Sequence, residues 1–427
     1  MLSQSKWNQK RVGRLLKSLG PGIVTGASDD DPSGIATYAQ AGAALGYSTL
    51  WTALVTYPLM AGVQLICAKV GLVTGKGLSS VLHERFSPKI SYPAVLALVI
   101  ANTINAGADI TAIAAGINLL VPIPIAVSVA PIALLILVLQ FWGNYRLIAT
   151  IFKWLTFALL AYVAASFYAR PDLGAVLQGT LLPKIQFDRS YLETLLAILG
   201  TTISPYLFFW QASQEVEEKN LRIRQPRRER GTMAENLTDA AWDINLGMFF
   251  SNLIMYFIIL TTAATLHRAG QTNIQSASEA AEALRPLAGD AATILFALGM
   301  IGTGFLAVPI LTASAAYAVA EAAKWKRHSL DQTPRRAFNF YAVIAAITVV
   351  ALALNFSGIN PIKALYWTAV INGFLAGPLL VLIMLIANNK TVMKNSVNGL
   401  ALNVLGWSAT GIMSLAALGL VLTWICP

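Results

Sequence analysis

Three consecutive aspartates, Asp29 to Asp31, are the side chains in this sequence best suited to bind a cation. They lie midway along an apolar stretch of bilayer-spanning length, GIVTGASDDDPSGIATYAQAGAALG. A charged side chain at the bilayer centre costs roughly 2.5–3.5 kcal/mol, so acids inside a membrane span mark ion or substrate sites. The alternative is that the span ends early and the triplet is an exposed loop, but neither flank would then be long enough to cross.

The residues after the triplet predict a break in this helix. Pro32 cannot donate a backbone hydrogen bond and Gly34 tolerates unusual torsions, so we expect an unwound segment directly after Asp31. Such irregular backbone at membrane depth survives where it lines a cavity.

A matching interruption occurs later in the chain, in LAILGTTISPYLFFWQAS. It consists of Thr201, Thr202, Ser204 and Pro205. Interrupted helices at corresponding positions of two halves indicate an inverted-repeat transporter with its site near the bilayer midplane.

A further acid, Asp109, lies in the apolar stretch IANTINAGADITAIAAGINLL, with Asn102 and Asn105 nearby. An intramembrane carboxylate at this place favours a proton or ion pathway. The alternative is that Asp109 makes a structural hydrogen bond between two helices.

The elements that must position these groups follow from composition. Of 427 residues, 56% are hydrophobic and 12% are charged, against about 25% charged in soluble domains. Apolar stretches of roughly 20 residues, enough to cross a bilayer, recur along nearly the whole chain. They do not alternate as the strands of a membrane β-barrel would. We therefore predict an all-α membrane protein.

Eleven membrane spans are predicted, and no soluble domain interrupts them, so we expect one transmembrane domain over residues 1–427. The spans are approximately 16–43, 47–70, 92–118, 123–142, 148–168, 191–213, 240–263, 288–320, 338–355, 361–388 and 399–425.

The distribution of Lys and Arg predicts the orientation. With the N-terminus in the cytoplasm, the inside segments hold 24 of the 30 basic residues. We expect a multi-pass protein of the inner cell membrane with a cytoplasmic N-terminus and an extracytoplasmic C-terminus.

Several other functions find no support in the sequence. The basic stretch RIRQPRRER lies between two spans and lacks interleaved aromatic residues, so we interpret it as a topology-setting loop and expect no nucleic-acid partner. Cys67 and Cys426 form no zinc or disulfide pattern. No nucleophile–base constellation or phosphate-binding loop is present, so we predict no enzymatic activity.

Over most of its length the sequence resembles the NRAMP family of divalent-metal transporters. Gly20-Pro21-Gly22 resembles the family's opening stretch, Asp31-Pro32-Ser33-Gly34 its Asp-Pro-Gly-Asn motif, and Ser204-Pro205-Tyr206 its sixth-span Met-Pro-His. The resemblance implies a leucine-transporter-type fold of two inverted five-helix repeats, about 16–168 and 191–388, plus a peripheral helix at about 399–425. It also implies that Asp31 is a metal ligand, with the carbonyl of Thr201 a second.

Departures from the family motifs suggest a site for a hard cation. Gly34 stands where the family has an asparagine ligand, and Ser204 replaces the methionine thioether. Asn372 is the nearest polar residue where the family often places a glutamine in the tenth span, and Asp30 is a further candidate ligand. Oxygen ligands suit magnesium, calcium and manganese. These changes resemble the magnesium-transporting branch, and we expect Mg²⁺ or Mn²⁺ as the transported ion, with no cofactor.

The expected proton route is incomplete. The family's route resembles an Asp-x-x-Glu pair in the third span, but Asp109 has only alanine at Ala106 and Ala112. Tyr206 replaces the sixth-span histidine, and the three histidines fall in predicted loops. We predict transport that is not obligatorily coupled to protons, with Asp109 and Tyr206 as candidate pathway residues.

Three alternatives remain at this point. One is a proton-coupled Mn²⁺ or Fe²⁺ symporter. Another is a symporter of small organic solutes on the same fold, although the aspartates would repel a substrate carboxylate. The third is a membrane sensor, which usually carries a long soluble tail. The expected partners are divalent metal ions and the lipid bilayer, and a monomer is plausible.

Overall fold

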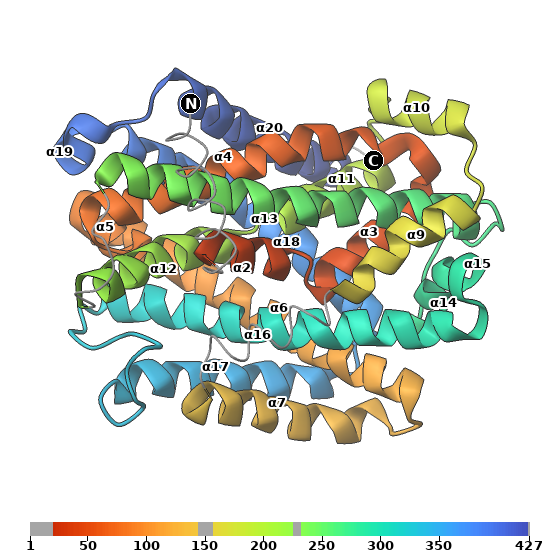
Figure 1. Ribbon diagram of the computed structural model, residues 1–427, viewed down its shortest axis with the longest axis horizontal. Coiled ribbons are helices and arrows are strands. Elements are labelled where there is room, and N and C mark those ends of the chain that lie inside the picture. The colour runs from red at the N-terminus through yellow and green to blue at the C-terminus, as the bar shows by residue number, and fades with distance from the viewer. Residues whose placement is uncertain (1–19, 144–156, 225–231, 426–427) are drawn as a thin grey trace, which may run out of the picture.

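The computed structural model describes residues 20–143, 157–224 and 232–425, and all regular elements in these ranges are helices (Figure 1). Within these ranges, eight helical segments are long and apolar enough to cross a membrane, and α17 is a shorter apolar helix. The all-α membrane fold predicted from the sequence is therefore confirmed. The helices are α2 (Pro21–Asp29), α3 (Pro32–Leu45), α4 (Trp51–Thr74), α5 (Leu78–Arg85), α6 (Pro88–Leu120), α7 (Ile125–Trp142), α9 (Leu160–Tyr168), α10 (Leu173–Leu181), α11 (Arg189–Thr202), α12 (Pro205–Arg224), α13 (Met233–Thr262), α14 (Ala277–Ala281), α15 (Arg285–Ala288), α16 (Ala292–Ala322), α17 (Phe338–Leu354), α18 (Pro361–Ala387), α19 (Lys390–Met393) and α20 (Leu400–Ile425).

The first span is broken at Asp30 and Asp31, not after Asp31 as the sequence predicted. Helix α2 ends at Asp29, and α3 begins at Pro32 with Asp31 as its N-cap residue. Proline is well tolerated at the first position of a helix, where no backbone donor is needed. Pro32 therefore starts the second half of the span, and the aspartates themselves form the break.

The sixth span is interrupted in the same way. Helix α11 ends at Thr202, Ile203 and Ser204 lie outside both helices, and α12 begins at Pro205. Ile203 has φ −117° and ψ 57°, outside the helical region. The two predicted interruptions are thus both present, and in both a proline opens the following helix.

Close helix crossings hold the broken spans in place. Helix α2 packs on α13, α12 and α16, whereas α3 packs on α13, α18 and α11. A Cβ atom on Gly26 of α2 would lie only 2.6 Å from Cα of Gly247 on α13. A Cβ atom on Gly200 of α11 would lie 2.8 Å from Cα of Gly373 on α18. Such contacts between small residues let membrane helices approach backbone to backbone.

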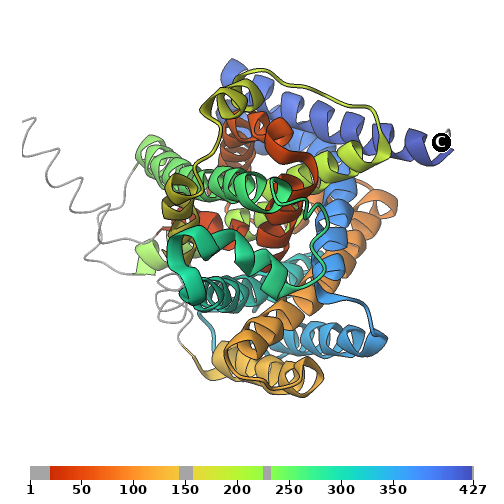
Figure 2. The same ribbon diagram turned by 90° about the vertical axis from the view of Figure 1, so that its right-hand side faces the viewer.

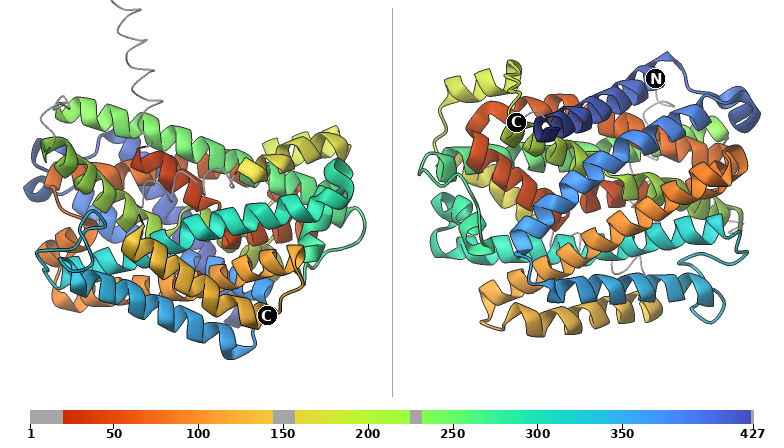
Figure 3. Two further views of the ribbon diagram at one scale, coloured as in Figure 1. Left: turned by 60° about the horizontal axis from the view of Figure 1, so that its bottom comes forward. Right: turned by 180° about the vertical axis from the view of Figure 1, so that it is seen from behind.

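The remaining helices form the edges of the bundle. Helices α7 and α17 pack together along one edge, and α20 lies along another, against α4, α18 and α11 (Figures 2 and 3). Helices α5 and α19, in loops predicted to be inside, lie at one end of the bundle, and α10, α14 and α15 lie at the other (Figure 1).

Several span boundaries differ from the predicted ones. Helix α13 begins at Met233, seven residues before the predicted start, because Thr232 and Glu235 form a capping box that extends its polar first turns. Helix α6 runs from Pro88 to Leu120, and α12 continues to Arg224. The first half of the predicted fifth span lies outside the described residues, which resume at Phe157.

Candidate ion-binding site

Asp31 is fixed at the break of the first span by three hydrogen bonds. Its Oδ1 accepts from the Ser33 hydroxyl at 2.6 Å and from the Gly34 amide at 2.7 Å. Its Oδ2 accepts from Nδ2 of Asn105 on α6 at 3.1 Å. The carboxylate is buried at the N-terminus of α3, where the helix dipole favours negative charge.

The two breaks meet at Gly34 and Thr201. A Cβ atom on Gly34 would lie 3.0 Å from Oγ1 of Thr201 and 3.3 Å from the carbonyl oxygen of Asp29. The absence of a side chain at Gly34 therefore allows the start of α3 to lie against the end of α11. The Thr201 hydroxyl is buried and makes no hydrogen bond to the residues that the structure describes.

Ser204 stabilises the break of the sixth span through its own hydroxyl. Its Oγ donates to the carbonyl oxygens of Thr201 at 2.7 Å and Gly200 at 2.8 Å. The Thr201 carbonyl oxygen, which has two lone pairs, thus accepts a hydrogen bond from Ser204, and the Thr201 hydroxyl lies on the same residue.

Asp29 and Asp30 turn toward α13, where both accept from the hydroxyl of Ser251, at 2.6 Å and 3.2 Å. One oxygen of each carboxylate is buried without a hydrogen bond among the described residues. Asp30, a predicted ligand, therefore shares its partner with Asp29, whereas Asp31 is tied to α6. The sequence analysis did not identify Ser251 as a site residue. Its position as a polar residue within the apolar stretch GMFFSNLIMYF was the signal that could have indicated it.

Asp109 lies beside Asp31 and the Ser33 backbone amide, at 0% exposure. Neither of its carboxylate oxygens makes a hydrogen bond within the described parts of the chain. A structural hydrogen bond from Asp109 to another helix therefore stays a prediction, as does its role in an ion or proton pathway. Asn102 makes a bond of that structural kind, since it donates to the carbonyl of Leu311 on α16 at 3.0 Å.

The remaining predicted residues lie on the helices around the breaks. The Tyr206 hydroxyl donates to the carbonyl of Ser28 at 2.7 Å and so ties α12 to the last turn of α2. Asn372 is buried on α18, one residue before the close approach of Gly373 to α11. None of the histidines lies at the breaks: His83 is in α5 and not in a loop as predicted, His267 ends the π-helical turn after α13, and His328 follows α16.

The site is closed to the outside of the protein. Asp29, Asp30 and Asp109 are 0% exposed and Asp31 is 2% exposed. Among the described residues, no three His, Cys, Asp or Glu side chains group closely enough to hold a metal ion. The oxygens that surround the breaks are of mixed type, from carboxylates, carbonyls, hydroxyls and amides.

Comparison with known proteins identifies a family for nearly the whole chain. Residues 22–423 match the model of the natural resistance-associated macrophage protein-like family, Nramp. The divalent metal cation transporter MntH of Pectobacterium carotovorum is 26% identical over 90% of this chain and 89% of its own length. The MntH of Erwinia tasmaniensis is 28% identical over 67% of this chain and 68% of its own length.

Solved structures show the same fold. The manganese transporter of Eremococcus coleocola superposes with a TM-score of 0.71 at 21% identity, covering 95% of this chain and 86% of that one. Mhp1, a nucleobase-cation-symport-1 family transporter, superposes with a TM-score of 0.59 at 15% identity, covering 95% and 91%. These likenesses confirm the leucine-transporter-type fold that the sequence resemblance implied.

Proposed function

Because this chain belongs to the Nramp family of membrane transporters, we propose that it carries divalent metal cations across the cell membrane. The observation that carries the proposal is the buried Asp31 carboxylate at the first break, where Gly34 lies against the Thr201 hydroxyl of the second break. A negative charge with several oxygen donors in a closed, low-dielectric site suits a small dication.

We assign Asp31 and the Thr201 carbonyl as the first ligands of the ion. The Ser204 hydroxyl, the Asn372 amide and the Asp30 carboxylate complete the candidate set. Gly34, the remaining candidate, supplies no side-chain ligand, and its lack of a Cβ atom lets the start of α3 pack against Thr201.

The nature of these donors supports Mg²⁺ and Mn²⁺ as substrates. Carboxylate, carbonyl, hydroxyl and water are hard ligands, and the site lacks the thioether that would favour softer metals. Magnesium usually keeps several waters and binds through one or two carboxylates, which is the donor set available at this break.

Transport follows an alternating-access scheme on this proposal. The carboxylates are enclosed, so movement of the repeats at about 16–168 and 191–388 against each other must open the site to each side in turn. The Lys and Arg distribution supports a cytoplasmic N-terminus and an extracytoplasmic C-terminus in the inner membrane.

Transport on this proposal is not obligatorily coupled to protons. Asp109 stands beside Asp31 without a second acid at Ala106 or Ala112, and the sixth span offers Tyr206, whose hydroxyl is engaged by Ser28. A membrane potential that is negative inside drives a dication at roughly 2.3 kcal/mol per charge per 100 mV.

The experiment is an uptake assay in proteoliposomes. We expect Mg²⁺ and Mn²⁺ to enter under an imposed inside-negative potential, and each to compete with the other. Uptake of a hydantoin or an amino acid without metal uptake would instead assign the chain to organic-solute symport and contradict the proposal.

A further inference from the structure

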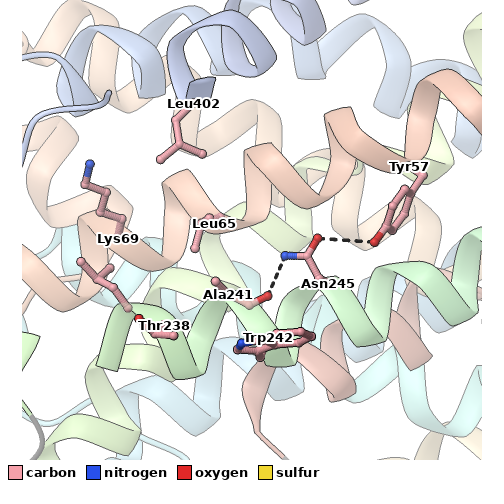
Figure 4. Close-up of a pocket in the computed structure, with 9 residues that line it drawn as sticks. Tyr57, Leu65, Lys69, Thr238, Ala241, Trp242, Asn245 and Leu402 are labelled. Carbon is pink, nitrogen blue, oxygen red and sulfur yellow. Dashed lines mark hydrogen bonds between the residues drawn. The ribbon is translucent and has the colours of Figure 1, made fainter. Parts of the chain in front are cut away.

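A groove on the outer surface of the bundle, formed by α4, α13 and α20, has no part in the proposed ion site. Its volume is about 590 Å³. The lining residues are Tyr57, Leu65, Lys69, Leu237, Thr238, Ala241, Trp242, Asn245 and Leu402. Figure 4 shows Lys69 and Tyr57 at opposite ends of the groove. They are twelve positions apart on α4, which corresponds to about 18 Å along the helix.

The groove lies on a face of the bundle where large apolar side chains are exposed. Trp242 and Leu246 of α13 are 63% and 47% exposed, and Leu400 and Val404 of α20 are 83% and 55% exposed. In a membrane-spanning bundle such side chains contact lipid. The walls of the groove itself are apolar at Leu65, Leu402 and Trp242, as an acyl chain requires (Figure 4).

One end of the groove carries a positive charge. The Lys69 ammonium donates to the carbonyl of Val397 at 2.9 Å and to Oδ1 of Asn398 at 3.4 Å. An ammonium has three donors, so one remains beyond these two bonds. Lysine within a membrane span is costly and marks a functional site by default.

More basic side chains lie on elements that pack on α4. Lys219 of α12 donates to the carbonyl of Leu72, three residues after Lys69, at 2.8 Å. Helix α19, which packs on α4, carries the exposed Lys390, and Lys394 follows it. The carboxylate of Glu235 on α13 accepts a hydrogen bond from the Thr232 amide at 2.7 Å, at the N-terminus of the same helix.

Lys69 lies about 9 Å along the helix axis before Gly75, the C-cap residue of α4. This is the side of the membrane that the Lys and Arg distribution predicts to be cytoplasmic. The cytoplasmic leaflet is rich in anionic lipids, and basic pockets between membrane helices on that side bind their headgroups.

We propose that this groove binds one anionic phospholipid of the cytoplasmic leaflet, with its phosphate at Lys69 and an acyl chain along Leu65, Trp242 and Leu402. On the wall formed by α13, Thr238 donates to the carbonyl of Ala234 and Asn245 is bonded to Ala241 and Tyr57, so Lys69 supplies the contact to the headgroup. The charge at one end and the apolar walls along the rest match the two parts of such a lipid.

The test is native mass spectrometry of the purified full-length protein, with phosphatidylglycerol and phosphatidylcholine of equal chain length. We expect the wild type to retain one phosphatidylglycerol in preference to phosphatidylcholine. Lys69→Gln should weaken this preference about fivefold, the change expected for one lysine at an anionic lipid, and Lys69→Arg should preserve it.

A second variant tests the groove without touching the charge. Ala241→Trp fills the groove and should lower retention of both lipids, whereas Leu418→Trp, at an exposed position of α20 outside the groove, should leave it unchanged. Inorganic phosphate should not displace the lipid. Equal retention of the two lipids by the wild type, undiminished retention in Ala241→Trp, or displacement by phosphate alone would overturn the proposal.

Discussion

Asn105 and Asp31, which are 74 positions apart in the chain, meet at the break of the first span, where Nδ2 of Asn105 donates to Oδ2 of Asp31 at 3.1 Å. This bond fixes the carboxylate from the side of α6, while Ser33 and Gly34 hold it from its own helix. The orientation of the proposed ion ligand therefore depends on three residues from two helices, α3 and α6, and not on the acid alone.

Asn105→Ala should raise the apparent KM for Mn²⁺ and Mg²⁺ about tenfold, because a hydrogen bond to a charged group contributes about 1.5–3 kcal/mol. Concentration-dependent uptake into proteoliposomes measures this. Asn102→Ala is the matched control, since Asn102 lies one turn earlier on α6 and donates to Leu311, away from Asp31. An equal change in KM for both variants would mean that the effect is a general loss of helix packing.

Ser204 should determine which metals compete for the site. We expect Cd²⁺ to compete poorly with Mg²⁺ and Mn²⁺ in the wild type, because the site offers oxygen donors only. Ser204→Met alone should not produce Cd²⁺ transport, since Gly34 still provides no side-chain ligand. Competition assays with each ion test this, and a wild type that prefers Cd²⁺ or Fe²⁺ over Mg²⁺ would refute the hard-site argument.

Gly26→Ala should destabilise the protein by about 1–3 kcal/mol, because the added Cβ would lie 2.6 Å from Cα of Gly247 and overpack the α2–α13 crossing. Gly411→Ala on α20 is the control, since a Cβ there meets nothing within 4 Å. Thermal unfolding in detergent compares the two. Equal thermal unfolding midpoints for Gly26→Ala and Gly411→Ala would show that the stability of the protein does not depend on the close α2–α13 crossing.

Metal uptake should proceed without proton entry. Liposomes loaded with a pH-sensitive dye should show no internal acidification when Mg²⁺ enters under an imposed potential. Asp109 is the titratable side chain placed beside Asp31 to carry a proton. Acidification that scales with Mg²⁺ concentration and disappears in Asp109→Asn would establish coupling through this residue and contradict the proposal.

The existence of the two breaks followed from residue types, whereas the exact residues of the first break and the direction of each side chain did not. Acids, prolines and glycine in apolar stretches identify Asp31 and Ser204 because such residues are unusual at membrane depth. The pairing of Asp29 and Asp30 with Ser251 depends on how α13 crosses α2, which no local pattern encodes. For the same reason the sequence could not show which of Asn102 and Asn105 contacts Asp31. The packing of α6 decides this, because Asn105 donates to Asp31 and Asn102 donates to Leu311 on α16.

Ion binding by Asp31 is the central claim, and uptake by an Asp31→Asn variant tests it most directly. Asparagine keeps an acceptor for the Gly34 amide and caps α3, but it removes the charge. Asp31→Ala provides a second variant, and Asp290→Asn, at an exposed position, provides the control. We predict that Mg²⁺ and Mn²⁺ uptake by both Asp31 variants falls to the level of empty liposomes while Asp290→Asn is unaffected. Undiminished uptake by Asp31→Asn, at equal amounts of inserted protein, would contradict the account.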